Sequence, residues 1–327
     1  MEGTAEEWGE RLRELLVAPV RRVFRGDARA VELAMVCLLA EGHLLVEGLP
    51  GNGKTTLAKA LAKTIGGTYR RIQFTPDLMP AELTGYQRPT LGGDDEFRKG
   101  PLFANVVVAD EVNRASPKTQ SALLEAMEEH AVSVDGVSHA IDRPFLLIAT
   151  QNPVDLQGTY LLPEAQLDRF LVRVRVADPD EATERDIAAG RAGKVDDLSA
   201  TLSVPEVRQA IRAARKLVRA GDPLVEYAVR VVRATRESAE LERGASVRAS
   251  GALVRAVRAH ALLRGSDFPN ADDVQALAGP VLAHRLTAAP GARRTPEEVV
   301  VELVGRVPVP EQLRAARKRW RGARGDG

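Results

Sequence analysis

The chain has 327 residues, of which 44% are apolar and 28% charged, and this composition predicts a soluble globular protein of one large domain or two smaller ones. Its 46 basic and 45 acidic residues nearly cancel, which argues against a role in coating polyanions but does not exclude a local basic site. No run approaches the ~18 apolar residues of a membrane span, and the acidic N-terminus is unlike a signal peptide.

The cysteine and histidine content bears on redox and metal chemistry. The single cysteine, Cys37, lies in an apolar run, so we expect a buried thiol, no internal disulfide and a cytoplasmic protein. The five histidines lack the spacing of metal ligands, which argues against a zinc site.

In chain order, two helical patterns come first, at residues 5–25 and about 29–40. Short apolar runs then alternate with helical patterns. We expect strands at residues 43–47, 69–74, 102–109, 145–150 and 171–176, and further helices at 54–64 and 117–130. Buried strands separated by helices predict an α/β fold, in which a parallel sheet is sandwiched by helices.

Two segments interrupt this alternation. A polar, glycine-rich stretch at about 78–98 indicates an insertion, and Asp135-Gly136 between alternating residues predicts a hairpin within about 131–145.

From residue 178 onward the patterns are helical, most clearly at 205–219, 224–241, 247–263 and 270–286, and the tail from Gln312 is rich in arginine. We therefore expect an α/β domain at 1–177 and an all-α domain at 178–327. For the basic tail, a solvated chain end is favoured over contact with nucleic acid or an acidic partner.

The stretch Gly48-Leu-Pro-Gly-Asn-Gly-Lys-Thr-Thr56 lies between an expected strand and an expected helix. Its glycines let backbone N–H groups converge on an anion, and the N-terminus of the following helix adds partial positive charge. Lys54 would reach the β- and γ-phosphates of a nucleotide, and Thr55 would ligate Mg²⁺. A glycine-rich turn that fits the pattern by chance is the alternative. The residues expected to hold the nucleotide are Gly48, Pro50, Gly51, Asn52, Gly53, Lys54, Thr55 and Thr56.

Polar side chains follow two of the later apolar strands. At the end of Val106-Val-Val-Ala-Asp-Glu111, Asp110 would face the phosphates and hold Mg²⁺ through its water, and Glu111 would polarise the attacking water. The alternative is an acidic pair that only caps the next helix. Asn152, after Ile148-Ala-Thr-Gln, would orient the water or touch the γ-phosphate, unless it only makes a turn before Pro153.

Several longer runs resemble the MoxR branch of the AAA+ ATPases, and the similarity continues to about Pro310. They are residues 109–128, Arg71-Ile-Gln-Phe-Thr-Pro-Asp-Leu78, Ala149-Thr-Gln-Asn-Pro153, Leu162-Pro-Glu-Ala-Gln-Leu-Asp-Arg-Phe170 and Gly244-Ala-Ser-Val-Arg-Ala249. The resemblance implies a P-loop AAA+ core at 1–177, an all-α lid domain at 178–327, and ATP with Mg²⁺ as cofactors.

The resemblance also implies roles for two arginines. Arg169 occupies the position of an arginine finger that acts on the ATP of a neighbouring subunit, where the alternative is a helix-end salt bridge. Arg248 matches the sensor-2 arginine of the lid, although Val247 stands where the family commonly has proline, and action in cis or in trans stays open. The segment at 78–98 matches the helix-2 insertion and the 131–145 hairpin the pre-sensor-1 hairpin, which contacts the client or is a plain surface hairpin.

The function that the resemblance implies is a chaperone-like ATPase that works as a homo-oligomeric ring, usually a hexamer. Relatives of this branch mature client proteins, often by metal-cofactor insertion, with a partner that carries a von Willebrand factor A domain on another polypeptide. The alternatives are a nucleic-acid-directed AAA+ motor, a chelatase-like motor subunit and a nucleotide-dependent scaffold. Near-neutral charge and 4% aromatic residues argue against the nucleic-acid motor, which needs a basic groove and stacking rings.

Overall fold

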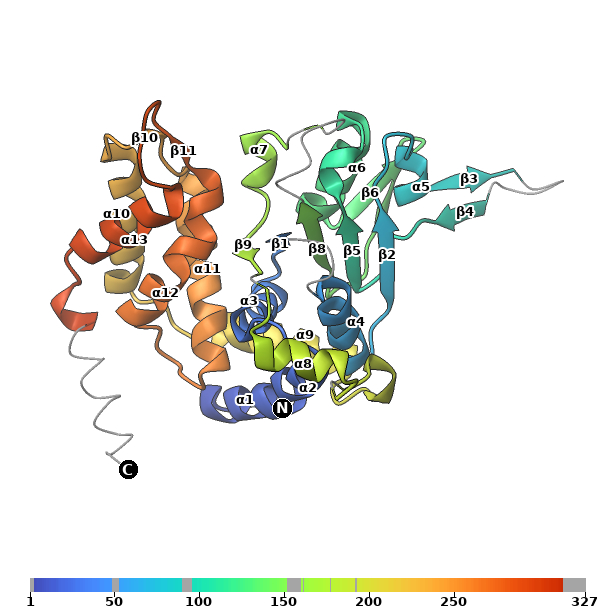
Figure 1. Cartoon of the computed structure of the whole chain (residues 1–327), viewed down its shortest axis with the longest axis horizontal. Coiled ribbons are helices and arrows are strands. Elements are labelled where there is room, and N and C mark those ends of the chain that lie inside the picture. Colours follow the sequence, from blue (N-terminus) through green and yellow to red (C-terminus); the bar gives the residue numbers. More distant parts are fainter. Residues whose placement is uncertain are drawn as a thin grey trace. The chain divides into compact units, whose positions relative to one another are not determined.

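The computed structural model describes residues 3–48, 53–89, 96–151, 160, 162–176, 178–191 and 193–313 (Figure 1). Its contacts divide the chain into two compact units. The sheet unit comprises Arg13–Phe170 and Val174–Gln209, and the helical unit comprises Met1–Leu12, Leu171–Arg173 and Ala210–Gly327.

Strands β2, β5, β8 and β1 form the centre of the sheet unit, and they belong to a five-stranded sheet with the order β2-β5-β8-β1-β9. Strand β5 runs parallel to both β2 and β8, and β8 runs parallel to β1. Strands β5 and β8 are buried along almost their whole length, as expected for apolar runs inside a parallel sheet. The five expected strands are present with differences of one residue at most of their ends, but the strand expected from residue 102 begins only at Val106, after a turn and bend at 102–105. Their bounds are β1 (Leu44–Glu47), β2 (Tyr69–Gln73), β5 (Val106–Asp110), β8 (Leu146–Gln151) and β9 (Val172–Arg175).

Helices flank this sheet and confirm the predicted α/β architecture (Figure 1). Helix α3 (Ala28–Leu39) contacts β1, and α4 (Lys54–Thr64) contacts β2 and β5. Helix α6 (Pro117–Glu129) shares one buried cluster with β5 and β8, which includes Leu123 of the helix and Leu147 of β8. Shorter helical segments complete the unit, namely η2 (Val112–Arg114), α7 (Glu164–Leu167), α8 (Glu181–Ala188) and η3 (Val195–Asp197).

The N-terminal helical pattern differs from the single helix expected over 5–25. Helix α1 (Ala5–Leu12) is followed by a π-helical turn, η1 (Arg13–Val17), and by α2 (Ala18–Val23). Pro19 has no N–H to donate and its ring crowds the preceding turn, so the regular i→i−4 hydrogen bonds are interrupted here. The spacing of apolar residues is helical over the whole segment, and Pro19 explains the π-helical turn between the two α-helices.

The insertion expected at about 78–98 contains a short helix and a hairpin. Helix α5 (Pro80–Thr84) leads into β3 (Gly85–Arg88), which pairs antiparallel with β4 (Glu96–Lys99). Gly85 has a φ of 92°, and a Cβ there would lie 2.0 Å from the carbonyl oxygen of Arg98, so the turn into the hairpin requires glycine. The glycine-rich residues 90–95 lie outside the described part of the chain.

The second predicted hairpin is also present. Strands β6 (Ala131–Val134) and β7 (Val137–Ala140) pair across Asp135-Gly136, whose φ angles of 50° and 80° suit a tight turn. The ring of His139 stacks on that of Phe97 with centroids 3.7 Å apart. The two hairpins therefore contact each other within the sheet unit.

The helical unit contains the helices expected after residue 210. Helix α12 packs against both α11 and α13. The buried carboxylate of Asp273 accepts hydrogen bonds from His260 and Arg264, which ties α12 to α11. Two short strands, β10 (Leu241–Arg243) and β11 (Thr287–Ala288), pair in addition to the expected helices. The other elements are α10 (Asp222–Glu237), α11 (Val247–Leu263), α12 (Ala271–Leu282), η4 (Ala283–Arg285) and α13 (Pro296–Arg306).

The two units do not divide the chain at residue 177, where the sequence pattern changes. Met1–Leu12 belongs to the helical unit, because α1 packs on α11 and a Cβ at Gly9 would lie 2.4 Å from the backbone of Gly265. Residues 178–209 belong to the sheet unit, where Lys63 of α4 donates to the carbonyl oxygen of Asp196. Helix α9 (Val204–Lys216) begins in one unit and ends in the other. The assignment of 1–177 and 178–327 as functional domains remains a prediction.

Among the residues that the structure describes, no helix is long and apolar enough to cross a bilayer.

Candidate functional site

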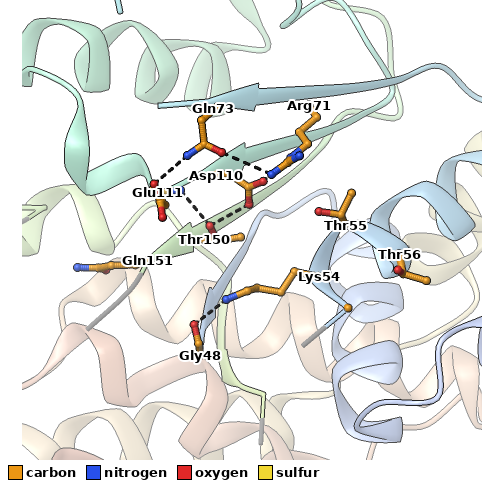
Figure 2. Close-up of a pocket in the computed structure, with 11 residues that line it drawn as sticks. Gly48, Lys54, Thr55, Thr56, Arg71, Gln73, Asp110, Glu111, Thr150 and Gln151 are labelled. Carbon is orange, nitrogen blue, oxygen red and sulfur yellow. Dashed lines mark hydrogen bonds and ion pairs between the residues drawn. The ribbon is translucent and has the colours of Figure 1, made fainter. Parts of the chain in front are cut away.

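A cavity of about 280 Å³ opens at the carboxyl ends of the central strands in the sheet unit (Figure 2). Ligands of open α/β sheets bind at this edge, outside the carboxyl ends of parallel strands. The cavity is lined by side chains from β2, β5, β8 and α4, and its lining residues are Gly48, Gly53, Lys54, Thr55, Thr56, Arg71, Gln73, Asp110, Glu111, Thr150 and Gln151.

The described ends of the glycine loop lie at this cavity. Gly53 is the N-cap of α4 with a φ of 76°, and a Cβ there would lie 3.0 Å from the ring of Phe24, so both the backbone and the space favour glycine. Helix α4 thus points its N-terminal end, with its free N–H groups, at the cavity. Pro50, Gly51 and Asn52 lie outside the described residues, and their expected contacts stay predictions.

Lys54 begins α4 and lies partly buried in the cavity. Its ammonium group donates to the carbonyl oxygen of Gly48 at 2.6 Å. Burial lowers the pKa of Lys54, and the nearby carboxylates of Asp110 and Glu111 oppose that shift. Thr55 and Thr56 line the same cavity. A cation and two hydroxyls at a helix N-terminus suit the binding of phosphate.

Asp110 ends the buried strand β5, and its side chain is only 11% exposed. One carboxylate oxygen, Oδ1, accepts a hydrogen bond from the hydroxyl of Thr150 at 3.0 Å. The other, Oδ2, accepts from Nε of Arg71 at 2.6 Å, a contact that raises the pKa of Arg71. Both oxygens are thus paired with side chains from the neighbouring strands β8 and β2.

Glu111 directly follows Asp110 and has left-handed backbone geometry, with a φ of 57°. Its Oε2 atom accepts hydrogen bonds from Gln73 at 2.8 Å and from Arg114 at 3.0 Å (Figure 2 shows the bond to Gln73). Its backbone N–H donates to the hydroxyl of Thr150 at 2.9 Å. This hydroxyl therefore fixes Asp110 and Glu111 together.

The donors in the cavity fit Mg²⁺ held jointly with a nucleotide. Within the described ranges, no group of three or more His, Cys, Asp or Glu side chains is placed to hold a metal ion. Thr55 and Asp110 offer oxygen donors on two sides of the cavity. Mg²⁺ in phosphate-binding sites takes one or two protein oxygens, and phosphate oxygens and water complete its coordination.

Three residues with predicted roles lie elsewhere or outside the described part. Asn152 is not among the described residues, although its neighbour Gln151 lines the cavity. Arg169 follows α7 and is absent from the described lining of the cavity. Its guanidinium donates to the carbonyl oxygen of Leu124 at 2.9 Å and lies 3.2 Å from the carboxylate of Glu128. Arg248 lies in the first turn of α11 in the helical unit, with an exposed side chain.

The cavity also contains side chains to which the sequence analysis assigned no role. These are Arg71, Gln73, Thr150 and Gln151. Arg71 and Gln73 are separated by one residue on β2, so a strand assignment places both on the same face of the sheet. The sequence analysis did not predict the strand order. Only the order β2-β5-β8 makes these side chains neighbours of Asp110 and Glu111.

Two family models match the chain. The model of the ATPase family associated with various cellular activities (AAA) matches residues 43–172, and that of the AAA lid domain matches residues 233–303. The first match contains the whole described lining of the cavity, from Gly48 to Gln151.

Individual proteins match over nearly the whole chain. It is 43% identical to the uncharacterised protein YeaC of Bacillus subtilis, over 92% of this chain and 96% of that protein. It is 40% identical to Chaperone MoxR1 of Mycobacterium tuberculosis, over 91% of this chain and 82% of that protein. Its fold matches the crystal structure of a Cytophaga hutchinsonii protein with a TM-score of 0.85, at 32% identity, over 94% of this chain and 97% of that one.

The Thr150 hydroxyl supplies the first prediction. Thr150→Val keeps the shape of this buried side chain but removes the donor to Asp110 and the acceptor for the Glu111 N–H. Unpaired buried polar groups cost about 1–3 kcal/mol, so we expect the free energy of unfolding to fall by that amount in urea titrations. Thr150→Ser keeps the hydroxyl and should lose less, about 1 kcal/mol for the methyl group. Equal stability of the two variants would contradict this role.

Proposed function

Because this chain belongs to the MoxR family of AAA+ ATPases, we propose that its sheet-edge cavity binds ATP with Mg²⁺ and hydrolyses the terminal phosphate. The observation that carries the proposal is the convergence of Lys54, Thr55, Asp110 and Glu111 on one cavity in front of a helix N-terminus. Phosphoryl transfer needs positioning and charge neutralisation more than covalent chemistry from the protein, and these residue types supply both.

Each side chain then has a distinct task. Lys54 would neutralise charge on the β- and γ-phosphates, and Thr55 and Asp110 would hold Mg²⁺, whose chemistry there is charge neutralisation at the phosphates. Glu111 accepts the proton of the attacking water as a general base. Gln73 and Arg114 occupy a carboxylate oxygen of Glu111, so this oxygen must leave at least one of them before it takes the proton. Asn152 orients the water in this proposal.

The proposed active form is a closed ring, because the arginine that we assign as the finger is not among the described residues that line the cavity of its own chain. Arg169 contacts Leu124 and Glu128 of its own α6, and it is not among the described residues that line the cavity. Its side chain is 30% exposed, so contact with a neighbouring copy is sterically open to part of it. We assign it as the arginine finger of the adjacent subunit in a homo-oligomer, a hexamer by analogy with the family. Arg248 would act as the lid's sensor for the same nucleotide cycle.

The process that ATP hydrolysis drives is proposed from the family relationship alone. A relative that is 40% identical is named a chaperone, which supports a role in remodelling or maturing client proteins. A partner with a von Willebrand factor A domain and metal-cofactor insertion into the client belong to the same proposal. A cytoplasmic location is likewise proposed, from the single, buried Cys37.

The general base is tested by Glu111→Gln. We expect this variant to bind ATP as the wild type does and to lose at least about 10²-fold in turnover, since the amide cannot take up the proton. Glu129→Gln, at the exposed end of α6, is the matched control and should hydrolyse ATP normally. Phosphate release and binding of a fluorescent ATP analogue measure the two properties. Undiminished turnover in Glu111→Gln would remove it from this role.

The shared site is tested by mixing two inactive proteins. Arg169→Ala should lose about 10³-fold or more in turnover, as measured for arginine fingers in general. Lys54→Ala should also be inactive, because its own cavity lacks the cation that contacts the phosphates, whereas its Arg169 is intact. A mixture of the two should regain activity at interfaces where an intact cavity meets an intact Arg169. Arg169→Ala that is active alone, or a folded mixture that stays inactive, would contradict trans action.

A further inference from the structure

The carboxylate of Asp110 has a counter-ion that the proposed chemistry does not use. Nε of Arg71 donates to Oδ2 of Asp110 at 2.6 Å, and the Oδ1 atom of Asp110 is already bonded to Thr150. The Asp110 side chain is 11% exposed and that of Arg71 is 52% exposed. An exposed cation therefore occupies the remaining oxygen of a nearly buried anion.

The strand register explains why Arg71 reaches this position. In the parallel pair β2–β5, Gln73 lies beside Asp110 and Arg71 beside Val108. Arg71 and Gln73 share one face of β2, and NH2 of Arg71 lies 3.5 Å from Oε1 of Gln73. Figure 2 shows the Arg71 side chain at the same cavity as Thr55 and Lys54. The guanidinium of Arg71 therefore lies at the cavity in which we propose that metal and phosphates bind.

Resting on the function proposed above, we propose that Arg71 is a displaceable counter-ion that makes metal binding at Asp110 depend on nucleotide. In the nucleotide-free protein the guanidinium competes with a divalent cation for Oδ2 of Asp110. When a nucleotide enters, its phosphate oxygens offer the planar guanidinium of Arg71 a more strongly charged acceptor and draw it away from the carboxylate. Asp110 then becomes available to the metal that the same phosphates bring.

The ion pair between Arg71 and Asp110 is weak enough for a ligand to displace. A pair in which one partner is half exposed is worth little in water, because solvent screens the attraction. The competition should therefore change divalent-metal affinity by about two- to five-fold, which is the scale of exposed ion pairs. Arg71 is a positioning residue in this account, since it acts through the state of Asp110.

The chain offers a matched control next to Arg71. Arg70 precedes it on β2, its side chain is exposed, and its NH1 donates to the carbonyl oxygen of Tyr69 at 3.1 Å. Arg70→Gln removes the same charge from the same strand but from the opposite face. It therefore separates loss of the contact with Asp110 from a general loss of positive charge.

The test is Mn²⁺ binding to the full-length, nucleotide-free protein, followed by the loss of the free-ion signal in electron paramagnetic resonance. Arg71→Gln should bind Mn²⁺ about two- to five-fold more tightly than the wild type, whereas Arg70→Gln should match the wild type. Adding Asp110→Asn to Arg71→Gln should abolish the gain. Arg71→Ala serves as a second variant with the same expected gain. Unchanged or weaker Mn²⁺ binding in the Arg71 variants, or an equal gain in Arg70→Gln, would overturn the proposal.

A second arm measures the coupling between metal and nucleotide. A saturating fluorescent ATP analogue should strengthen Mn²⁺ binding in the wild type by a larger factor than in Arg71→Gln, because the wild type starts from the occupied carboxylate. An equal factor in both proteins would contradict the proposal. If the analogue fails to bind the wild type, the proposed ATPase function fails, while the nucleotide-free comparison still decides the role of Arg71.

Discussion

Two adjacent carboxylates at the end of a buried strand are the constraint on which this site depends. Asp110 and Glu111 cannot be left unpaired at a low-dielectric sheet edge, because burying an uncompensated charge is costly. The protein pairs them from both sides of β5, with Arg71 and Gln73 from β2 and Thr150 from β8. The same pairing defines what a ligand must displace before chemistry can begin.

This arrangement joins the architecture to the proposed reaction. The strand order β2-β5-β8 places the side chains that hold the carboxylates on the strands next to them, and the N-terminus of α4 faces the same cavity. The ammonium group of Lys54 donates a hydrogen bond to the carbonyl oxygen of Gly48. The carboxylate of Asp110 accepts one from Arg71, and that of Glu111 accepts hydrogen bonds from Gln73 and Arg114. These three side chains are therefore held by partners of their own chain, and in the proposed function nucleotide binding would exchange some of these contacts for phosphate and metal.

The sequence predicted the elements and the main motifs but not how the strands meet. Apolar runs and the glycine loop identified β1, β5, β8 and α4, because burial and phosphate binding each leave a local pattern. Arg71 and Gln73 carried no such pattern, since their importance comes from the register between β2 and β5. The two compact units also depend on contacts between residues that are far apart in the sequence. Gly9 packs against Gly265, a contact between residues far apart in sequence that no local period reveals.

The central claim is that nucleotide binds at this sheet edge through the loop that ends in Lys54. The most direct measurement is calorimetric titration of the full-length protein with a non-hydrolysable ATP analogue and Mg²⁺. We expect one site per chain in the wild type, binding weakened by at least about tenfold in Lys54→Ala because a charge-assisted contact is lost, and unchanged binding in Lys59→Ala, whose exposed lysine lies on the same helix. No binding to the wild type, or equal binding in Lys54→Ala, would contradict the account.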